Sequence, residues 1–198
     1  MYQLKTENNY DFGEVISALQ KEIRRGHETE AMFWALELYE RYGKALWTRL
    51  QVIVNEDIGI ANPQAIILIE TLKKQFEEFV KGDRDGSMRL ALANAILYLC
   101  RSPKSREADH FQCVVNQRRL QQEWRLDIPN YALDKHTSRG ARMKRSWQHW
   151  FEVGCQLIPE PQPNPYQEEA QTLWPTMKKK KKDQMANDES LPFDAPED

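Results

Sequence analysis

Apolar residues recur at helical spacing along most of this chain, in segments that short turn-forming sequences separate. The first segment covers residues 11–25, where Asp11 is a favourable helix N-cap with Glu14 three residues later, and Gly26 ends the segment. Its apolar face consists of Val15, Ile16, Leu19 and Ile23. No segment alternates convincingly between apolar and polar residues. The sequence therefore predicts an all-α fold, a compact multi-helix bundle.

The same reasoning places the other helices. They are expected at residues 29–42, 44–55, 63–80, 88–101, 106–124 and 140–153. Gly43 is expected to end the first of these. Asn62 is expected to cap the helix that begins at Pro63, because proline is favoured at the first helical position. Residues 88–101 are apolar almost all round, so this helix is expected to be central and buried.

Composition places the chain among globular proteins, with 40% apolar and 29% charged residues. No apolar run reaches the length that spans a bilayer, and the N-terminus lacks a signal-peptide pattern. We therefore expect a cytoplasmic location and no membrane association. A helical domain is expected at residues 1–158. Residues 159–198 are rich in proline, lysine and acids and are expected to form a disordered tail.

The cysteines and histidines give no sign of a metal site. Cys100, Cys113 and Cys155 are scattered, without a Cys-x-x-Cys pair, and no two histidines have His-x-x-x-His spacing. We therefore expect no metal, no cofactor and no disulfide framework, with reduced thiols in a helical core.

Two adjacent carboxylates precede a glycine and an Asn-Pro pair. Such paired acids can serve as general acid and base or as metal ligands. They can also end a helix, with the glycine supplying a left-handed turn. Adjacent helical residues point about 100° apart, so the two carboxylates do not converge. A structural turn is favoured, with an arginine or backbone N–H groups as compensating partner. Its residues are Glu56, Asp57, Gly59, Asn62 and Pro63.

This turn belongs to an ordered set of motifs: "RGHETEAMFWALELYERYG" (25–43), "RLQVIVNEDIGIANPQA" (49–65) and "LALANAILYLCRSPKS" (90–105). They resemble the C-terminal domain of the replication-associated recombination protein A family. That family is also called maintenance of genome stability protein A and includes the Werner helicase-interacting AAA+ ATPases. The resemblance covers about residues 25–105. It extends more weakly over 127–145, through "IPNYALDKHTS".

The resemblance implies a helical oligomerisation domain, which forms a tetramer in the family. There it is attached to a DNA-dependent ATPase that acts at stalled replication forks. An ATPase needs a Gly-x-x-x-x-Gly-Lys-Ser/Thr loop, whose backbone amides cradle phosphate. The glycines of this chain form no such pattern. We therefore expect a stand-alone chain that lacks the ATPase module and is not an enzyme.

A basic segment followed by aromatic residues lies near the end of the predicted domain. The candidate nucleic-acid contacts are Lys135, His136, Arg139, Arg142, Lys144 and Arg145. Cations of this kind neutralise phosphates, and aromatic rings stack on bases. In the alternative interpretation the cations form a solvated loop, while the aromatics dock the last helix onto the bundle. Those aromatics are Trp147, Trp150 and Phe151.

A third interpretation of this segment is enzymatic. It makes Asp134, His136 and Thr137 an acid, a base and a nucleophile. Side chains so close in sequence rarely converge without a special turn, which disfavours this interpretation.

An apolar cluster, Leu191, Pro192 and Phe193, stands in the acidic end of the chain. It resembles two short peptides, the sliding-clamp-binding hexapeptide and the acidic Pro-Phe tip of bacterial single-strand DNA-binding proteins. In such peptides apolar side chains anchor in a pocket, and the flanking acids face a basic rim. A sliding clamp or a single-strand DNA-binding protein is the partner that this cluster predicts, and a chance match is the alternative.

Together these features predict a non-enzymatic, oligomeric helical module that acts in DNA replication, recombination or repair and contacts DNA through its basic segment. The first alternative is a regulatory protein that binds a separate AAA+ ATPase without touching DNA. The second is an uncharacterised enzyme.

Overall fold

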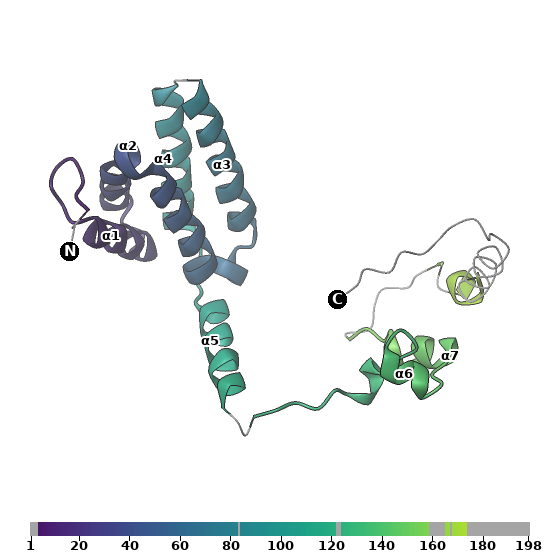
Figure 1. The fold of residues 1–198 in the computed structure, drawn as a ribbon. Helices are drawn as coiled ribbons and strands as arrows, with labels where there is room; N and C mark the ends of the chain where they lie inside the picture. The colour runs from purple at the N-terminus through teal and green to yellow at the C-terminus, as the bar shows by residue number, and fades with distance from the viewer. Residues whose placement is uncertain (1–3, 83, 122–123, 159–164, 167, 174–198) are drawn as a thin grey trace, which may run out of the picture. The chain divides into compact units, whose positions relative to one another are not determined.

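The computed structural model describes residues 4–82, 84–121, 124–158, 165–166 and 168–173 (Figure 1). Over these residues the fold is all-α, as predicted, and the only strand-like pairing is an isolated bridge between Lys5 and Asp11. Contacts within the chain divide it into two compact units, Met1–Trp124 and Arg125–Asp198. This division, between Trp124 and Arg125, lies earlier in the chain than the boundary expected near residue 158. The domain boundary near residue 158 stays a prediction.

The first unit consists of two packed helix pairs and a further helix. Its α-helices are α1 (Phe12–Arg25), α2 (Glu28–Ile53), α3 (Gln64–Lys81), α4 (Asp85–Arg101) and α5 (Glu107–Leu120). A π-helical turn, η1 (Val54–Ile58), and a 3-10 turn, η2 (Gly59–Ala61), connect α2 to α3. Helix α1 packs on α2, and α3 packs on α4 (Figure 1). The core between them includes Leu19, Leu38, Trp47, Ile69 and Leu92.

The ends of α1 follow the sequence prediction. The Oδ1 atom of Asp11 accepts hydrogen bonds from the backbone N–H groups of Gly13 and Glu14 at 2.9 and 3.2 Å. Gly26 ends the helix at a φ of 77°, in the left-handed region that favours glycine. The predicted apolar face is buried. Burial of each of its aliphatic side chains contributes about 1.5–3 kcal/mol to stability.

Two details of the predicted helices differ. The helices predicted at residues 29–42 and 44–55 are joined in α2, and the predicted break beside Gly43 is present as a kink at Tyr42, where φ is −125° and ψ is 30°. Helix α4 is buried on one face only, since Leu90 on its other face is 67% exposed. Its buried residues lie on the opposite side, so α4 is buried along one face rather than all round, and that face contacts α1, α2 and α3.

The second unit contains short elements. They are η3 (Asn130–Ala132), α6 (Ser138–Arg142), α7 (Trp147–His149) and the π-helical turn η4 (Trp150–Gly154). The helix expected over residues 140–153 is thus divided, and Lys144, at a φ of 55°, lies in the break. Most of the predicted tail, residues 159–198, lies outside the described residues.

Candidate functional site

Asp57 lies in η1, where the end of α2 meets α1 and the start of α5. Its side chain is 1% exposed. The Nε atom of Arg24 lies 2.9 Å from Asp57 Oδ1, and Gln20 Nε2 donates to Asp57 Oδ2 at 3.0 Å. The backbone N–H of Ser105 donates to the carbonyl oxygen of Asp57 at 2.9 Å. A buried carboxylate needs such partners because desolvation penalises its charge. Asp57 is therefore held between three parts of the chain.

Glu56 extends the same set of contacts toward α5. Its carboxylate accepts a hydrogen bond from Gln20 Nε2 at 3.0 Å and pairs with Arg106 Nη2 at 2.9 Å. The same Arg106 nitrogen pairs with Asp109, in the first turn of α5, at 2.7 Å. We call Gln20, Arg24, Glu56, Asp57 and Arg106 the junction network. Both carboxylates form ion pairs with an arginine and accept a hydrogen bond from the Gln20 amide. These contacts support a structural rather than a catalytic role for the pair.

The rest of the predicted turn is as expected at Gly59, which has a positive φ, and differs at Asn62. Gly59 adopts a φ of 46°, and a Cβ there would lie 3.7 Å from the Cβ of Ala108 in α5. Asn62 does not cap α3. Its Nδ2 instead donates to Tyr98 Oη and Ser102 Oγ, both at 3.2 Å, which ties the turn to the end of α4.

Helix α5 has no buried residue. It contacts the rest of the unit mainly through η1 and η2. Figure 1 shows that it extends away from the α1/α2 and α3/α4 helix pairs. One side of the helix nevertheless carries an apolar stripe at i, i+3 and i+4 spacing: Phe111, Val114 and Val115, which are 70%, 47% and 36% exposed. An amphipathic helix with an uncovered apolar face is a feature of interaction surfaces.

The basic segment separates into exposed and engaged cations. Arg139, Arg142 and Lys144 are exposed. Lys135 Nζ lies 3.8 Å from the centroid of the Trp147 ring, in a cation–π contact. Arg145 Nη2 donates to Asn130 Oδ1 at 2.7 Å. Three of the six predicted nucleic-acid contacts therefore present free charge on the surface of α6 and the turn after it.

His136, the sixth of these residues, is exposed at its side chain but packs its ring against others. The ring lies edge-on to Trp147 and Trp150, with centroids 5.5 and 5.6 Å apart. Trp147 also stacks on Phe151 at 6.0 Å. The aromatics thus pack on one another and on His136 within the second unit. Their docking onto the helical bundle stays a prediction.

The suggested catalytic trio is engaged in local structure. The backbone N–H of His136 donates to Asp134 Oδ1 at 2.8 Å and, with the imidazole, lowers the pKa of the Asp134 carboxyl below its ordinary value. The Thr137 hydroxyl donates to the Asp134 carbonyl oxygen and accepts from the Gly140 N–H, each at 3.0 Å. Thr137 is therefore the N-cap of α6, and its hydroxyl is not directed at the imidazole.

Gly140 is required by this packing. A Cβ at this position would lie 1.7 Å from the carbonyl oxygen of Asp134, which is backbone and cannot move aside. The sequence alone suggests that Gly140 lets the backbone approach a ligand closely, whereas in the structure the Asp134 backbone occupies that space.

The remaining predictions concern the tail, metal binding and membrane association, and the described residues test them only in part. Leu191, Pro192 and Phe193 lie outside the described residues. Within the described residues, no group of three or more His, Cys, Asp or Glu side chains could hold a metal ion. No described helix is both long enough and apolar enough to cross a membrane.

Comparison with known proteins gives consistent matches. Residues 27–186 match the family model described as MgsA AAA+ ATPase C terminal. The chain is 30% identical over 168 residues to replication-associated recombination protein A of Bacillus subtilis, which covers 76% of this chain and 37% of that protein. It is 29% identical over 127 residues to the Haemophilus influenzae protein of the same name, covering 63% of this chain and 26% of the relative.

The Escherichia coli K12 protein of that name is 32% identical over 96 residues, covering 48% of this chain and 21% of the relative. The chain therefore spans little more than a third, or less, of the length of each of these three relatives.

Proposed function

The chain belongs to the MgsA AAA+ ATPase C-terminal family, and from this premise we propose that it is a non-enzymatic assembly module in replication-associated recombination. It associates with further copies of itself through the apolar face of α5. The replication and recombination context comes from the names of the relatives, and the tetramer from the resemblance noted above.

The single observation that carries the assembly proposal is the exposure of α5. A helix of 14 residues is marginal in water unless an apolar face is packed against a partner. In α5 that face points to solvent, while the junction network fixes the start of the helix through Arg106. Burial of Phe111 and Val114 against a second copy would supply the missing packing.

Hydrogen–deuterium exchange tests where assembly occurs. In a free chain the amides of α5 are expected to exchange rapidly, because no buried residue protects them. Raising the protein concentration is expected to slow exchange in α5 selectively, and to leave exchange in α1 unchanged. Exchange in α5 that does not depend on concentration, in a protein that associates, would place the interface elsewhere.

The non-enzymatic part of the proposal rests on two observations. The sequence contains no phosphate-binding Gly-x-x-x-x-Gly-Lys-Ser/Thr loop. The carboxylates and the hydroxyl that suggested catalysis hold local structure, in the junction network and at the N-terminus of α6.

A second candidate function is contact with DNA through α6. It is favoured by the exposed Arg139, Arg142 and Lys144, whose charges are available to phosphates. Lys135 and Arg145 would position the segment through Trp147 and Asn130 rather than contact the phosphates. The sliding clamp or single-strand DNA-binding protein remains the proposed partner of Leu191, Pro192 and Phe193. A regulatory partner of a separate AAA+ ATPase is the alternative in which DNA contact is absent.

Replacement of Arg139, Arg142 and Lys144 by glutamine is expected to weaken binding to single-stranded or forked DNA. Each lost phosphate contact lowers the salt dependence, so for a single strand the slope of log K against log salt should fall by about 2. Fluorescence anisotropy at several salt concentrations measures both effects. The matched control replaces Arg25, Lys74 and Lys81 with glutamine, which removes the same charge from the first unit. If the two triple changes had equal effects, DNA binding would depend on the net charge of the protein and not on a specific contact through α6.

A further inference from the structure

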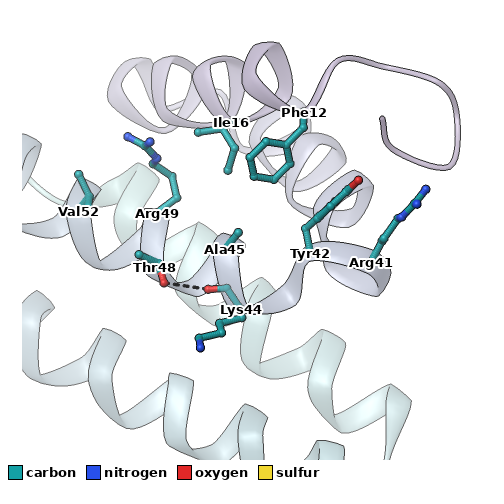
Figure 2. Close-up of a pocket in the computed structure, with 9 residues that line it drawn as sticks. All are labelled: Phe12, Ile16, Arg41, Tyr42, Lys44, Ala45, Thr48, Arg49 and Val52. Carbon is teal, nitrogen blue, oxygen red and sulfur yellow. Dashed lines mark hydrogen bonds between the residues drawn. The ribbon is translucent and has the colours of Figure 1, made fainter. Parts of the chain in front are cut away.

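A groove of about 560 Å³ lies between α1 and the kinked part of α2 (Figure 2). Phe12 and Ile16 of α1 face Ala45 of α2 and form its apolar floor. The Phe12 ring packs on Tyr42, with centroids 4.8 Å apart. Tyr42 is fixed in turn, because its hydroxyl donates to the carbonyl oxygen of Lys5 at 2.8 Å. The groove is therefore already formed in the folded unit.

The charged groups at this groove are all cationic. Figure 2 shows Arg41 and Arg49 near its two ends, whereas the Lys44 amine points to the side of α2 away from α1. Arg49 Nη1 donates to Gln20 Oε1 at 3.1 Å, and Arg41 Nη1 donates to Lys5 O at 3.4 Å. Within the described part of the chain, neither guanidinium forms an ion pair and no carboxylate lines the groove. By contrast, Arg24, Arg101 and Arg106 each pair with an acid.

We propose that the groove between α1 and α2 binds an acidic peptide segment of a partner protein. An apolar side chain of the peptide lies on the floor formed by Phe12, Ile16 and Ala45. Carboxylates on either side of it pair with Arg41 and Arg49. This binding is independent of the assembly through α5, since the groove and the stripe of Phe111, Val114 and Val115 share no residue.

The spacing of the two arginines defines the peptide. They are eight residues apart along α2, which corresponds to about 12 Å of helix rise. An extended peptide covers that distance in about four residues. The fitting pattern is therefore an acid, a small residue, an apolar pair and a second acid, which places the two acids four residues apart. Because unpaired cations flank an apolar floor, the partner gains both apolar burial and charge complementarity.

A nucleic acid fits this groove less well. A single strand is bound by a track of several cations along its backbone together with rings that stack on successive bases. Here only Arg41 and Arg49 of the three lining cations lie at the ends of the groove on the side of α1 (Figure 2), and the Phe12 ring is already packed on Tyr42. Aliphatic groups, which do not stack, form the remainder of the floor.

The test uses the full chain and a fluorescein-labelled synthetic peptide of sequence Asp-Asp-Ser-Leu-Phe-Asp-Asp. Fluorescence anisotropy is expected to show saturable binding that weakens with salt. Replacement of Arg41 and Arg49 by glutamine should weaken it about tenfold, in line with the loss of two solvent-exposed ion pairs. Thr48→Glu, at an exposed position in the groove, should weaken it as well by repelling the peptide. The control pair Arg25→Gln and Lys74→Gln should leave the affinity unchanged.

Control peptides separate the two parts of the recognition. Asparagine in place of every aspartate, or serine in place of Leu and Phe, should each weaken binding by about tenfold or more. Absence of binding by the wild-type chain would overturn the proposal, as would equal affinities of the arginine and control variants. A ten-thymidine single strand that binds more tightly than the peptide, and loses affinity with the Arg41 and Arg49 changes, would assign the groove to nucleic acid instead.

Discussion

Phe111→Asp combined with Val114→Asp is expected to convert the assembled protein to monomers. Both side chains are exposed in the single chain, so the change leaves the core intact. In an assembly they would be buried, and two carboxylates would then be placed in an apolar interface without partners. Lost burial alone weakens association by about 100-fold or more. Light scattering coupled to size-exclusion chromatography measures the result.

The matched control adds the same charges to the opposite side of α5. Cys113 and Gln117 are exposed and lie one helical turn apart, away from the apolar stripe. Cys113→Asp with Gln117→Asp should therefore leave the particle mass unchanged. Circular dichroism establishes that each variant retains its helices. Dissociation by both pairs of changes would indicate a general effect of negative charge on α5, against a specific apolar contact.

Arg24→Met is expected to produce the largest loss of stability among single changes at the junction. It leaves the Asp57 carboxylate buried with only Gln20 and the more distant Arg106, whose Nε lies 3.7 Å away. Breaking a fully buried ion pair typically destabilises a protein by 3–5 kcal/mol. Because Arg24 is 33% exposed and other partners remain, we expect a decrease of about 2–3 kcal/mol in the free energy of unfolding, measured by urea denaturation.

Arg101→Met serves as the comparison for this change. Arg101 forms a bidentate pair with Glu28 at 2.7 and 3.1 Å, but the Arg101 side chain is 65% exposed. Its replacement should lower stability far less than Arg24→Met does, since solvent screens such pairs. If the two variants lost equal stability, the junction network would be no more than a set of surface ion pairs.

Local signals in the sequence predicted local structure well. Asp11 and Gly26 define the two ends of α1 through chemistry that acts within a few residues, N-capping and a left-handed C-terminal glycine. The arginine partner expected for the Glu56–Asp57 pair is present in the described geometry as Arg24 and Arg106. That expectation needed only the rule that acids at the C-terminus of a helix are unfavourable for the helix dipole and require a compensating partner.

Tertiary features were beyond this reasoning. Periodicity shows that α5 has an apolar face, but it does not show whether another element covers that face, so Phe111 looks like a core residue in the sequence. The groove combines Phe12 of α1 with Arg41 and Arg49 of α2, which only packing brings together. In the basic segment, the difference between the exposed Arg139 and the engaged Arg145 arises from contacts with residues outside the run of charges.

The molar mass of the unmodified chain in solution tests the assembly module most directly. Multi-angle light scattering over a range of protein concentrations should give a multiple of the 23.4 kDa chain mass, fourfold for the tetramer that the resemblance implies. A mass that stays at 23.4 kDa up to concentrations of about 100 μM, well above typical dissociation constants of stable assemblies, would contradict the account.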